Sequence, residues 1–258
     1  MTTLDKSFLV LETLAELGPR VPLGTLQKAT LLPKATLYRL LRTMVDRGLV
    51  RYDTAGRYSI GPQVYRMAGA VYARWAPPPG ARAVMVELQR TAPETVHVSS
   101  FRHGQLMYVE KLDAPHPYQM SSRVGMAQCL HSSAIGKAIL AEIPAERAEV
   151  LLGQEALRPV TELTIVDPVR LLSELPAIHA AGYAIDDEED EEGLRAIGAA
   201  FCDDSGTPAG GVSIVAPSFR MSLAQARGYA PALVHAAQQI GEMFVGATPP
   251  QGLASNLT

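Results

Sequence analysis

The first sixty residues carry apolar side chains at helical spacing, followed by two short alternating runs. Helices are predicted over 4–17, over 23–29 and from Pro33 to a stop at Gly48. The third helix presents apolar side chains on one face, at the spacing i, i+3, i+4, i+7 and i+8: Leu37, Leu40, Leu41, Met44 and Val45. Only a turn at 30–32 separates it from the second helix, so the pair is predicted to form a helix-turn-helix.

The two alternating runs, 49–52 and 57–60, flank a turn that contains Gly56 and predict a β-hairpin. A hairpin in this position is the wing of a winged helix. Pro62 can then begin another helix that reaches Trp75. The PPPG stretch that follows is the clearest domain boundary in the chain.

Beyond this boundary, helical and strand patterns are mixed. We expect residues 117–124 to extend a sheet, and Pro231 to bend or interrupt the last helix. Strands grouped with helices that pack against them indicate an α+β fold. Helices are predicted over 81–91, 133–143, 144–152, 168–181 and 221–245, and strands over 94–102, 105–113, 194–202 and 208–216.

The helix over 62–75 carries Tyr72 and Trp75 on its apolar stripe. We favour a contact between two subunits, because both rings would otherwise lie exposed beside the hinge. A helix that covers its own domain is the alternative. The expected domains are a winged helix-turn-helix over 1–61, a linker helix and hinge over 62–80, a C-terminal domain over 81–248 and a flexible tail over 249–258.

Charge separates the two ends of this chain of 258 residues. Residues 1–76 hold 11 Lys and Arg against 5 Asp and Glu, a net charge of +6. Residues 77–258 hold 12 against 21, a net charge of −9. The basic part is suited to phosphates and the acidic part is not, so we expect two modules with different partners.

Several polar residues of the basic part are suited to bind double-stranded DNA. On the third helix Lys34, Thr36, Tyr38 and Arg39 lie off the apolar face, where they can reach a major groove. Helix, turn, wing and positive charge together favour DNA binding over the alternative, a winged helix that binds protein. A two-fold dimer would bind a palindromic operator with half-sites about 34 Å apart. Backbone contacts are expected from Thr25 and Lys28 on the second helix and from Arg51 and Arg57 on the wing.

Other classes of protein find little support in the sequence. No apolar run approaches the length of a membrane span, and the first residues lack the apolar core of a signal peptide. Cys129 and Cys202 form no disulfide framework. A cytoplasmic protein is therefore expected. No GxSxG elbow, SxxK pair or HExxH motif occurs. The acidic run 186–192 is expected to be solvated and mobile rather than to bind a metal. No metal and no cofactor are predicted.

A candidate pocket lies where residues 125–137 pass from a loop into a helix. Ser132 or Ser133 can cap this helix, and its free N–H groups can seat a carboxylate. An ordinary capped helix with a close contact at Gly136 explains the same residues equally well.

The order of these parts resembles the IclR-type family of bacterial transcription regulators over nearly the whole chain. The resemblance implies a winged helix-turn-helix, a linker helix and a GAF-like sensor domain, homodimers that often pair into tetramers, and repression or activation controlled by a small-molecule effector, often an organic or aromatic acid. The matching segments are LLPKATLYRLLRTMVDRGLV (31–50), GRYSIGP (56–62), ETVHVS (94–99), SRVGMAQCLHSSAIGKAILA (122–141), HAAGYAIDDEE (179–189) and EGLRAIGAAF (192–201).

The resemblance also implies site residues. DNA contacts carry over to Pro33, Lys34, Ala35, Thr36, Tyr38 and Arg39 and to the wing around Arg57. Effector contacts carry over to Gly125, Met126, Leu130, His131, Ala134, Ile135 and Asp186 (or Asp187), and to the later strand positions Ala196, Ser213 and Val215.

Two of those positions depart from the family pattern. Ala196 and Val215 stand where the family often has polar residues. The oxygens of a small polar acid such as glyoxylate or pyruvate would lack partners there, so a larger effector with an apolar ring is expected, an aromatic acid or a derivative.

Two other hypotheses remain open on the sequence. One is a hydrolase that uses Ser133, His131 and Asp186, with the winged helix as a docking module. The other is a regulator that binds DNA constitutively and has no effector.

Overall fold

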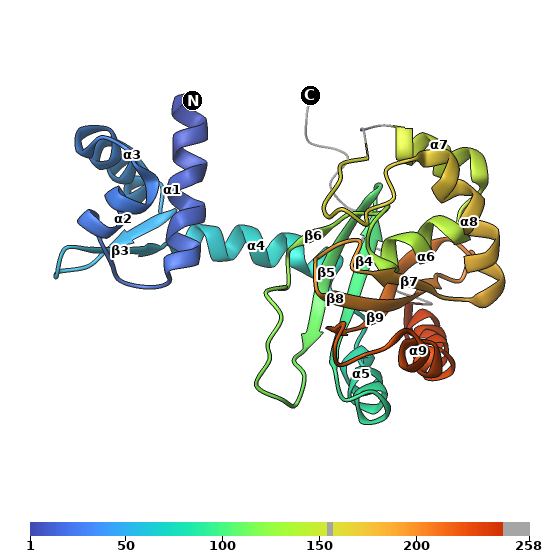
Figure 1. Cartoon of the computed structure of the whole chain (residues 1–258). Helices are drawn as coiled ribbons and strands as arrows, with labels where there is room; N and C mark the ends of the chain where they lie inside the picture. Colours follow the sequence, from blue (N-terminus) through green and yellow to red (C-terminus); the bar gives the residue numbers. More distant parts are fainter. Residues whose placement is uncertain (154–156, 245–258) are drawn as a thin grey trace. The chain divides into compact units, whose positions relative to one another are not determined.

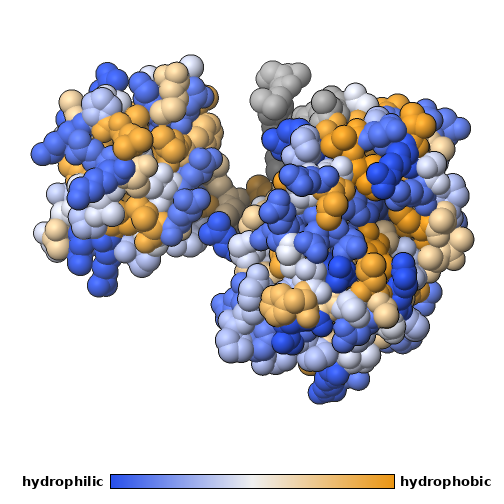
Figure 2. Space-filling model, in the orientation of Figure 1, coloured by the Kyte–Doolittle hydropathy of each residue, from blue (hydrophilic) through white to orange (hydrophobic). Residues whose placement is uncertain are grey.

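A computed structural model describes residues 1–153 and 157–244 (Figure 1). The chain divides into two compact units, the first covering Met1–Arg74 and the second beginning at Trp75. This division falls within the segment 62–80 that was predicted to be the linker. The predicted tail, 249–258, lies outside the described residues. In the space-filling view, apolar and hydrophilic side chains are interleaved on the visible face of each unit, as is normal for folded proteins (Figure 2).

The first unit is a winged helix-turn-helix, as predicted. Three helices pack around a core that contains the apolar face of the third: Leu37, Leu40, Leu41 and Met44. A short first strand, which the sequence patterns did not indicate, pairs with the wing, so the small sheet has the order β1-β3-β2. The elements are α1 (Thr3–Leu17), β1 (Val21–Pro22), α2 (Leu23–Thr30), α3 (Lys34–Asp46), β2 (Val50–Tyr52) and β3 (Arg57–Ile60).

Helix α4 (Pro62–Trp75) follows the wing and crosses the division between the units. None of its residues is buried. Trp75 is half-buried and packs against the core of the second unit, so its ring is not left exposed as the sequence suggested. The exposed apolar side chains of α4 include Tyr65, Met67 and Val71. An amphipathic helix without a buried face has apolar surface to offer to a partner.

The second unit is a six-stranded antiparallel sheet with helices on both faces (Figure 1). Its strand order is β6-β5-β4-β9-β8-β7. Helices α5 and α9 share one core with the sheet, and α6, α7 and α8 cover the other face. The elements are α5 (Ala81–Thr91), β4 (Thr95–Arg102), β5 (Gln105–Leu112), β6 (Ala127–Gln128), α6 (Ala134–Glu142), α7 (Ala145–Gly153), α8 (Pro168–Ala181), β7 (Ala184–Asp187), β8 (Leu194–Cys202), β9 (Pro208–Pro217) and α9 (Leu223–Phe244).

The structure of this unit differs from the sequence-based expectations in three places. Residues 117–124 form no strand; β6 extends the sheet instead, as a two-residue partner of β5. Strand β7 was missed, because its sequence runs directly into the acidic residues. The last helix is not interrupted at Pro231: buried residues on both sides of it, including Ala226 and Leu233, hold α9 against the core.

Two glycines let α6 approach its neighbours closely. A Cβ atom at Gly198 on β8 would lie 2.6 Å from the amide nitrogen of Ile135, and one at Gly136 would lie 2.5 Å from the carbonyl oxygen of Leu130. No side chain fits at either place. The first turn of α6 therefore rests directly on the sheet, beside the cavity described next.

Candidate functional site

The helix α3 presents a polar face to solvent. Lys34 and Arg39 are exposed beside Ala35 and Tyr38, whereas Thr36 is half-buried. Pro33 stands exposed at the N-cap, so the first turns of the helix are accessible. This face combines cationic, hydroxyl and aromatic groups that can reach base edges in a major groove.

The residues expected to contact the DNA backbone lie on the same unit. Thr25 and Lys28 are exposed on α2, and Arg51 is exposed on β2. Arg57 is less free, because its Nε donates to Oδ2 of Asp53 at 3.0 Å. The backbone N–H of Arg57 also donates to Asp53, which contributes most to holding the pKa of that carboxyl below its usual value.

Arg20 is a cationic residue that the sequence reasoning missed. It shares a surface hollow with Arg51 and Arg57 of the wing. Its backbone has a φ of 65°, and its N–H donates to the hydroxyl of Ser59. A lone arginine after Gly18-Pro19 gives no periodic signal, so only the fold places it beside the wing.

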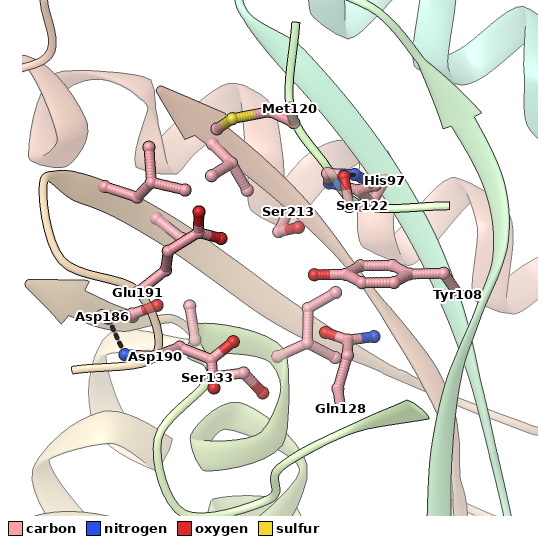
Figure 3. A pocket seen from close by; sticks show the side chains of 15 residues that line it. His97, Tyr108, Met120, Ser122, Gln128, Ser133, Asp186, Asp190, Glu191 and Ser213 are labelled. Carbon is pink, nitrogen blue, oxygen red and sulfur yellow. Dashed lines mark hydrogen bonds between the residues drawn. The ribbon is translucent and has the colours of Figure 1, made fainter. Parts of the chain in front are cut away.

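The second unit contains a cavity between the first turn of α6 and the sheet (Figure 3). The space between the lining residues is about 480 Å³, a value that includes solvent at the open mouth. The apolar part of the wall is formed by Met120, Ala134, Ile135, Leu194, Ala196 and Val215. The polar part is formed by His97, Tyr108, Ser122, Gln128, Ser133, Asp186, Asp190, Glu191 and Ser213.

Asp186 is a buried carboxyl in this wall. Its Oδ1 accepts hydrogen bonds from the backbone N–H groups of Glu189, at 2.7 Å, and Asp190, at 3.2 Å. Burial, followed by the charge of Asp190, raises its pKa to about 8, although the two backbone hydrogen bonds oppose this shift. Asp186 is therefore mainly protonated at neutral pH.

The acidic run 186–192 is ordered where it passes the cavity, contrary to expectation. Glu189 is buried and forms an ion pair with Lys137 of α6, which is also buried. The hydroxyl of Thr164 donates to the backbone carbonyl of Glu189 at 2.7 Å. Ser132 donates to the carboxyl of Asp190 at 2.5 Å. Glu189 and Asp190 are therefore bound by other residues of the fold rather than by solvent.

His97 closes the opposite wall as a neutral imidazole. Burial, with a smaller effect from Lys111, lowers its pKa to about 3. Its Nε2 shares a hydrogen bond of 2.8 Å with the Ser122 hydroxyl, and its ring lies 4.4 Å from that of Tyr108. Lys111 donates to the carbonyl oxygens of Met120 and Ser122, which fixes this segment against β5.

The cavity brings together six of the residues expected to contact an effector: Ala134, Ile135, Asp186, Ala196, Ser213 and Val215. The other four do not line it. Gly125 and Met126 are exposed before β6, Leu130 packs into the core beneath α6, and the His131 ring bonds to the carbonyl oxygen of Arg158 at 3.0 Å.

Of the remaining wall residues, Gln128 and Ser133 lie in the segment 125–137 that was predicted to form a pocket. The others were not predicted, and strand pairing explains this for the residues on the sheet. His97 on β4 lies opposite Ser213 on β9, and Val215 lies opposite Ala196 on β8. The alternation of ETVHVSS indicates a strand but not its partner. Without that pairing, His97 is a lone histidine with no evident neighbour.

The hydrolase arrangement is not assembled. The Ser133 hydroxyl donates to the carbonyl oxygen of Cys129 and accepts from the Gly136 N–H, so it caps α6. His131 is bonded to Arg158 rather than to Ser133.

Metal-binding clusters and membrane-spanning helices are missing from the part of the chain that the structure describes. Over 1–153 and 157–244, no three His, Cys, Asp or Glu side chains form a group that could hold a metal ion. No helix in these ranges has both the length and the apolar character needed to cross a membrane.

Comparison with known proteins gives matches over both units. The family model for the bacterial transcriptional regulator IclR C-terminal region matches residues 80–242, and that for the IclR helix-turn-helix domain matches residues 3–54. The HTH-type transcriptional regulator KdgR of Dickeya chrysanthemi is 31% identical over 240 residues, which cover 93% of this chain and 78% of that protein.

Solved structures agree with these matches. The crystal structure of the Thermotoga maritima IclR has a TM-score of 0.76 and 27% identity, and the match covers 94% of this chain and 98% of that one. An IclR homologue of Microbacterium hydrocarbonoxydans, solved in complex with 4-hydroxybenzoate, shares the fold, with a TM-score of 0.69, 22% identity and coverage of 94% and 99%. The chain therefore belongs to the IclR family of bacterial transcriptional regulators.

Proposed function

We propose that this DNA-binding transcription regulator responds to a small organic effector in the cavity of its second unit. The effector would be an aromatic acid or a derivative of one, and its binding would change the affinity of the protein for an operator. The protein would act in the cytoplasm as a sensor and not as an enzyme. An effector changes operator affinity only if it binds one conformation of the regulator better than another.

The observation that carries this proposal is the composition of the cavity wall. Ile135, Leu194 and Val215 offer apolar surface for a ring, and polar groups such as Tyr108 and Ser213 can orient it. A related fold holds 4-hydroxybenzoate in the Microbacterium hydrocarbonoxydans protein, so a ligand of this size is compatible with the architecture.

We propose further that the protein acts as a homodimer or as a dimer of dimers. Residues 1–61 would bind DNA, 62–80 would link, and the segment from 81 onward would sense the effector. The exposed apolar side chains of α4, including Tyr65, Met67 and Val71, support a contact between subunits. Two copies of α3 would then read a palindromic operator with half-sites about 34 Å apart.

Operator binding tests the proposal directly. The full-length protein is titrated onto its own upstream intergenic DNA, with and without a panel of benzoates, their amides and their amines. One compound should change the operator affinity of the native protein. Ala196→Phe, which fills the cavity, should bind the operator equally well but lose the response. Specific binding that ignores every compound would favour the constitutive regulator instead.

A further inference from the structure

The small sheet of the first unit carries two arginines on the face that is turned away from its core. Tyr58 of the central strand β3 is buried in the core, so the next residue, Ser59, belongs to the opposite face. Arg51 on β2 is paired directly with Ser59. On the other side, the backbone N–H of Arg20, just before β1, donates to the Ser59 hydroxyl at 2.9 Å. The two arginines thus flank Ser59, and both line one hollow.

Neither guanidinium group has a partner in the fold. Arg20 and Arg51 are both exposed, and their side chains form no hydrogen bond or ion pair with residues 1–153 or 157–244. Arg57 lines the same hollow, but it is bound to Asp53, which supplies the sole carboxyl group among the described residues of the lining. Like charges gathered on one face repel each other unless an anion lies between them. The hollow is therefore suited to an anion that comes from outside the chain.

The backbone of Arg20 gives independent support for a role of its side chain. Its φ of 65° lies in the left-handed region, where a residue with a Cβ atom meets a steric cost that glycine avoids. The hydrogen bond to Ser59 uses only the backbone N–H, which any residue except proline would provide. Stability alone would therefore favour glycine at this position. A strained residue that the local structure does not require indicates a functional site.

From these observations we propose that Arg20 and Arg51 together bind one phosphate of the DNA backbone over Ser59. Each guanidinium group presents its N–H donors in a planar fork, which suits the oxygens of a phosphate. This contact rests on the operator binding proposed above, and it adds a second phosphate site beside that of Arg57.

The width of the sheet places this contact on the backbone rather than inside a groove. Neighbouring strands lie about 4.8 Å apart, so the outer strands β1 and β2 are separated by roughly 10 Å. The minor groove of DNA is only about 6 Å wide and cannot admit this face. A phosphate contact carries no sequence information, so the arginine pair should strengthen binding to every DNA sequence alike.

Arg20→Gly tests the contact in the full-length protein. Glycine keeps the N–H for Ser59 and adopts the left-handed conformation freely, so the variant should resist urea at least as well as the native protein. Its affinity for operator and for scrambled DNA should nevertheless fall by about threefold to tenfold at physiological salt. The slope of log affinity against log salt should shrink by about 1 for each bound subunit. A more stable protein that binds DNA as well as the native one overturns the proposal.

Ethylation interference shows whether the two arginines share a phosphate. Operator DNA that carries one ethylated phosphate per molecule is bound by the native protein, by Arg20→Gly and by Arg51→Ala. Ethylation of the shared phosphate should weaken binding of the native protein and should no longer matter to either variant. The other contacted phosphates should remain sensitive in all three proteins. An interference pattern that is the same in all three contradicts the shared site.

Two further variants separate a local contact from a general effect of charge. Arg20→Lys keeps the charge and should recover most of the salt slope. Lys6→Gln removes one positive charge near the beginning of α1, whereas Arg20 follows the end of that helix, so this variant should bind DNA like the native protein. Equal losses in Lys6→Gln and Arg20→Gly would assign the effect to net charge and overturn the site.

The outcomes distinguish this site from the function proposed above. Absence of DNA binding by the native protein would contradict both. Native DNA binding that Arg20→Gly retains in full would contradict the phosphate site alone. If calorimetry then showed inorganic phosphate binding to the native protein but not to Arg20→Gly, the hollow would hold a free phosphate compound instead of DNA. Operator binding that depends on Arg20 but ignores every effector would support the site and contradict the sensor role.

Discussion

At the scale of single residues, Asp186 shows how the cavity affects stability. Its pKa is raised from 3.8 to about 8 in the folded protein, mainly by burial. The folded state therefore keeps a proton between pH 4 and 8 that the unfolded chain releases. The contribution of Asp186 to the free energy of unfolding is greatest below the pKa that this group has in the unfolded chain. It falls as the pH rises toward 8, by at most about 1.4 kcal/mol per pH unit.

Replacing Asp186 with Asn removes this titration. Asp186→Asn should gain stability relative to the native protein as the pH increases from 5 to 8, because the amide keeps the shape of the protonated acid. Urea unfolding at four pH values in this range measures the difference. Asp204→Asn, at an exposed position, is the control and should show little trend. A difference for Asp186→Asn that stays constant with pH would contradict the prediction.

Leu31 is a strained residue in the turn before α3. Its φ is 56°, in the left-handed region, and its side chain is 86% exposed. Leu31→Gly should raise the free energy of unfolding by up to about 1 kcal/mol, because glycine adopts this conformation without a steric cost. Ala29→Gly, within α2, should lower it by about 0.5–1 kcal/mol. Urea unfolding measures both variants. If the free energy of unfolding fell by a similar amount in Leu31→Gly and Ala29→Gly, Leu31 would not be strained.

At the scale of elements, α3 and the wing should contribute differently to DNA binding. Arg39 is exposed on α3, and Arg39→Ala should cost about 1–3 kcal/mol on the operator and relax its selectivity. Arg57 lies on the wing, where a phosphate contact carries no sequence information, so Arg57→Ala should lower the salt slope by about 1 without changing selectivity. Operator and scrambled DNA, titrated at several salt concentrations, separate the two effects.

Arg90→Ala provides the control, because Arg90 lies on α5 in the second unit and pairs with Glu87. It should bind both DNA molecules like the native protein. If Arg39→Ala left operator affinity and selectivity intact, α3 would not be the reading helix.

The elements also show which features the sequence could predict. The spacing of Leu37, Leu40, Leu41 and Met44 is local information, and it located α3 correctly. The cavity depends on distant pairings such as His97 with Ser213, which no local pattern contains. The ion pair of Lys137 with Glu189 joins α6 to the acidic run across 52 residues, so composition alone suggested a solvated segment instead.

At the scale of the whole molecule, the two units have opposite net charges and separate cores. Charge asymmetry and the PPPG stretch are both visible in the sequence, and together they predict two modules. The family match covers both, so one chain combines a DNA-binding unit with a unit that contains a cavity. An effect of an effector on DNA binding therefore requires energetic coupling between the two units.

The apolar face of α4 should hold two subunits together. Met67 and Val71 are one helical turn apart, and both are 55% exposed. Val71→Glu should weaken the dimer, because it places a charge in an apolar contact without a partner. Sedimentation should show more monomer, and affinity for the full palindrome should fall toward that for a half-site. Glu16→Gln, at an exposed position on α1, is the control for a surface charge change. If Val71→Glu stays dimeric and binds the palindrome normally, subunit contact must occur through another surface, and α4 would serve only to join the two units.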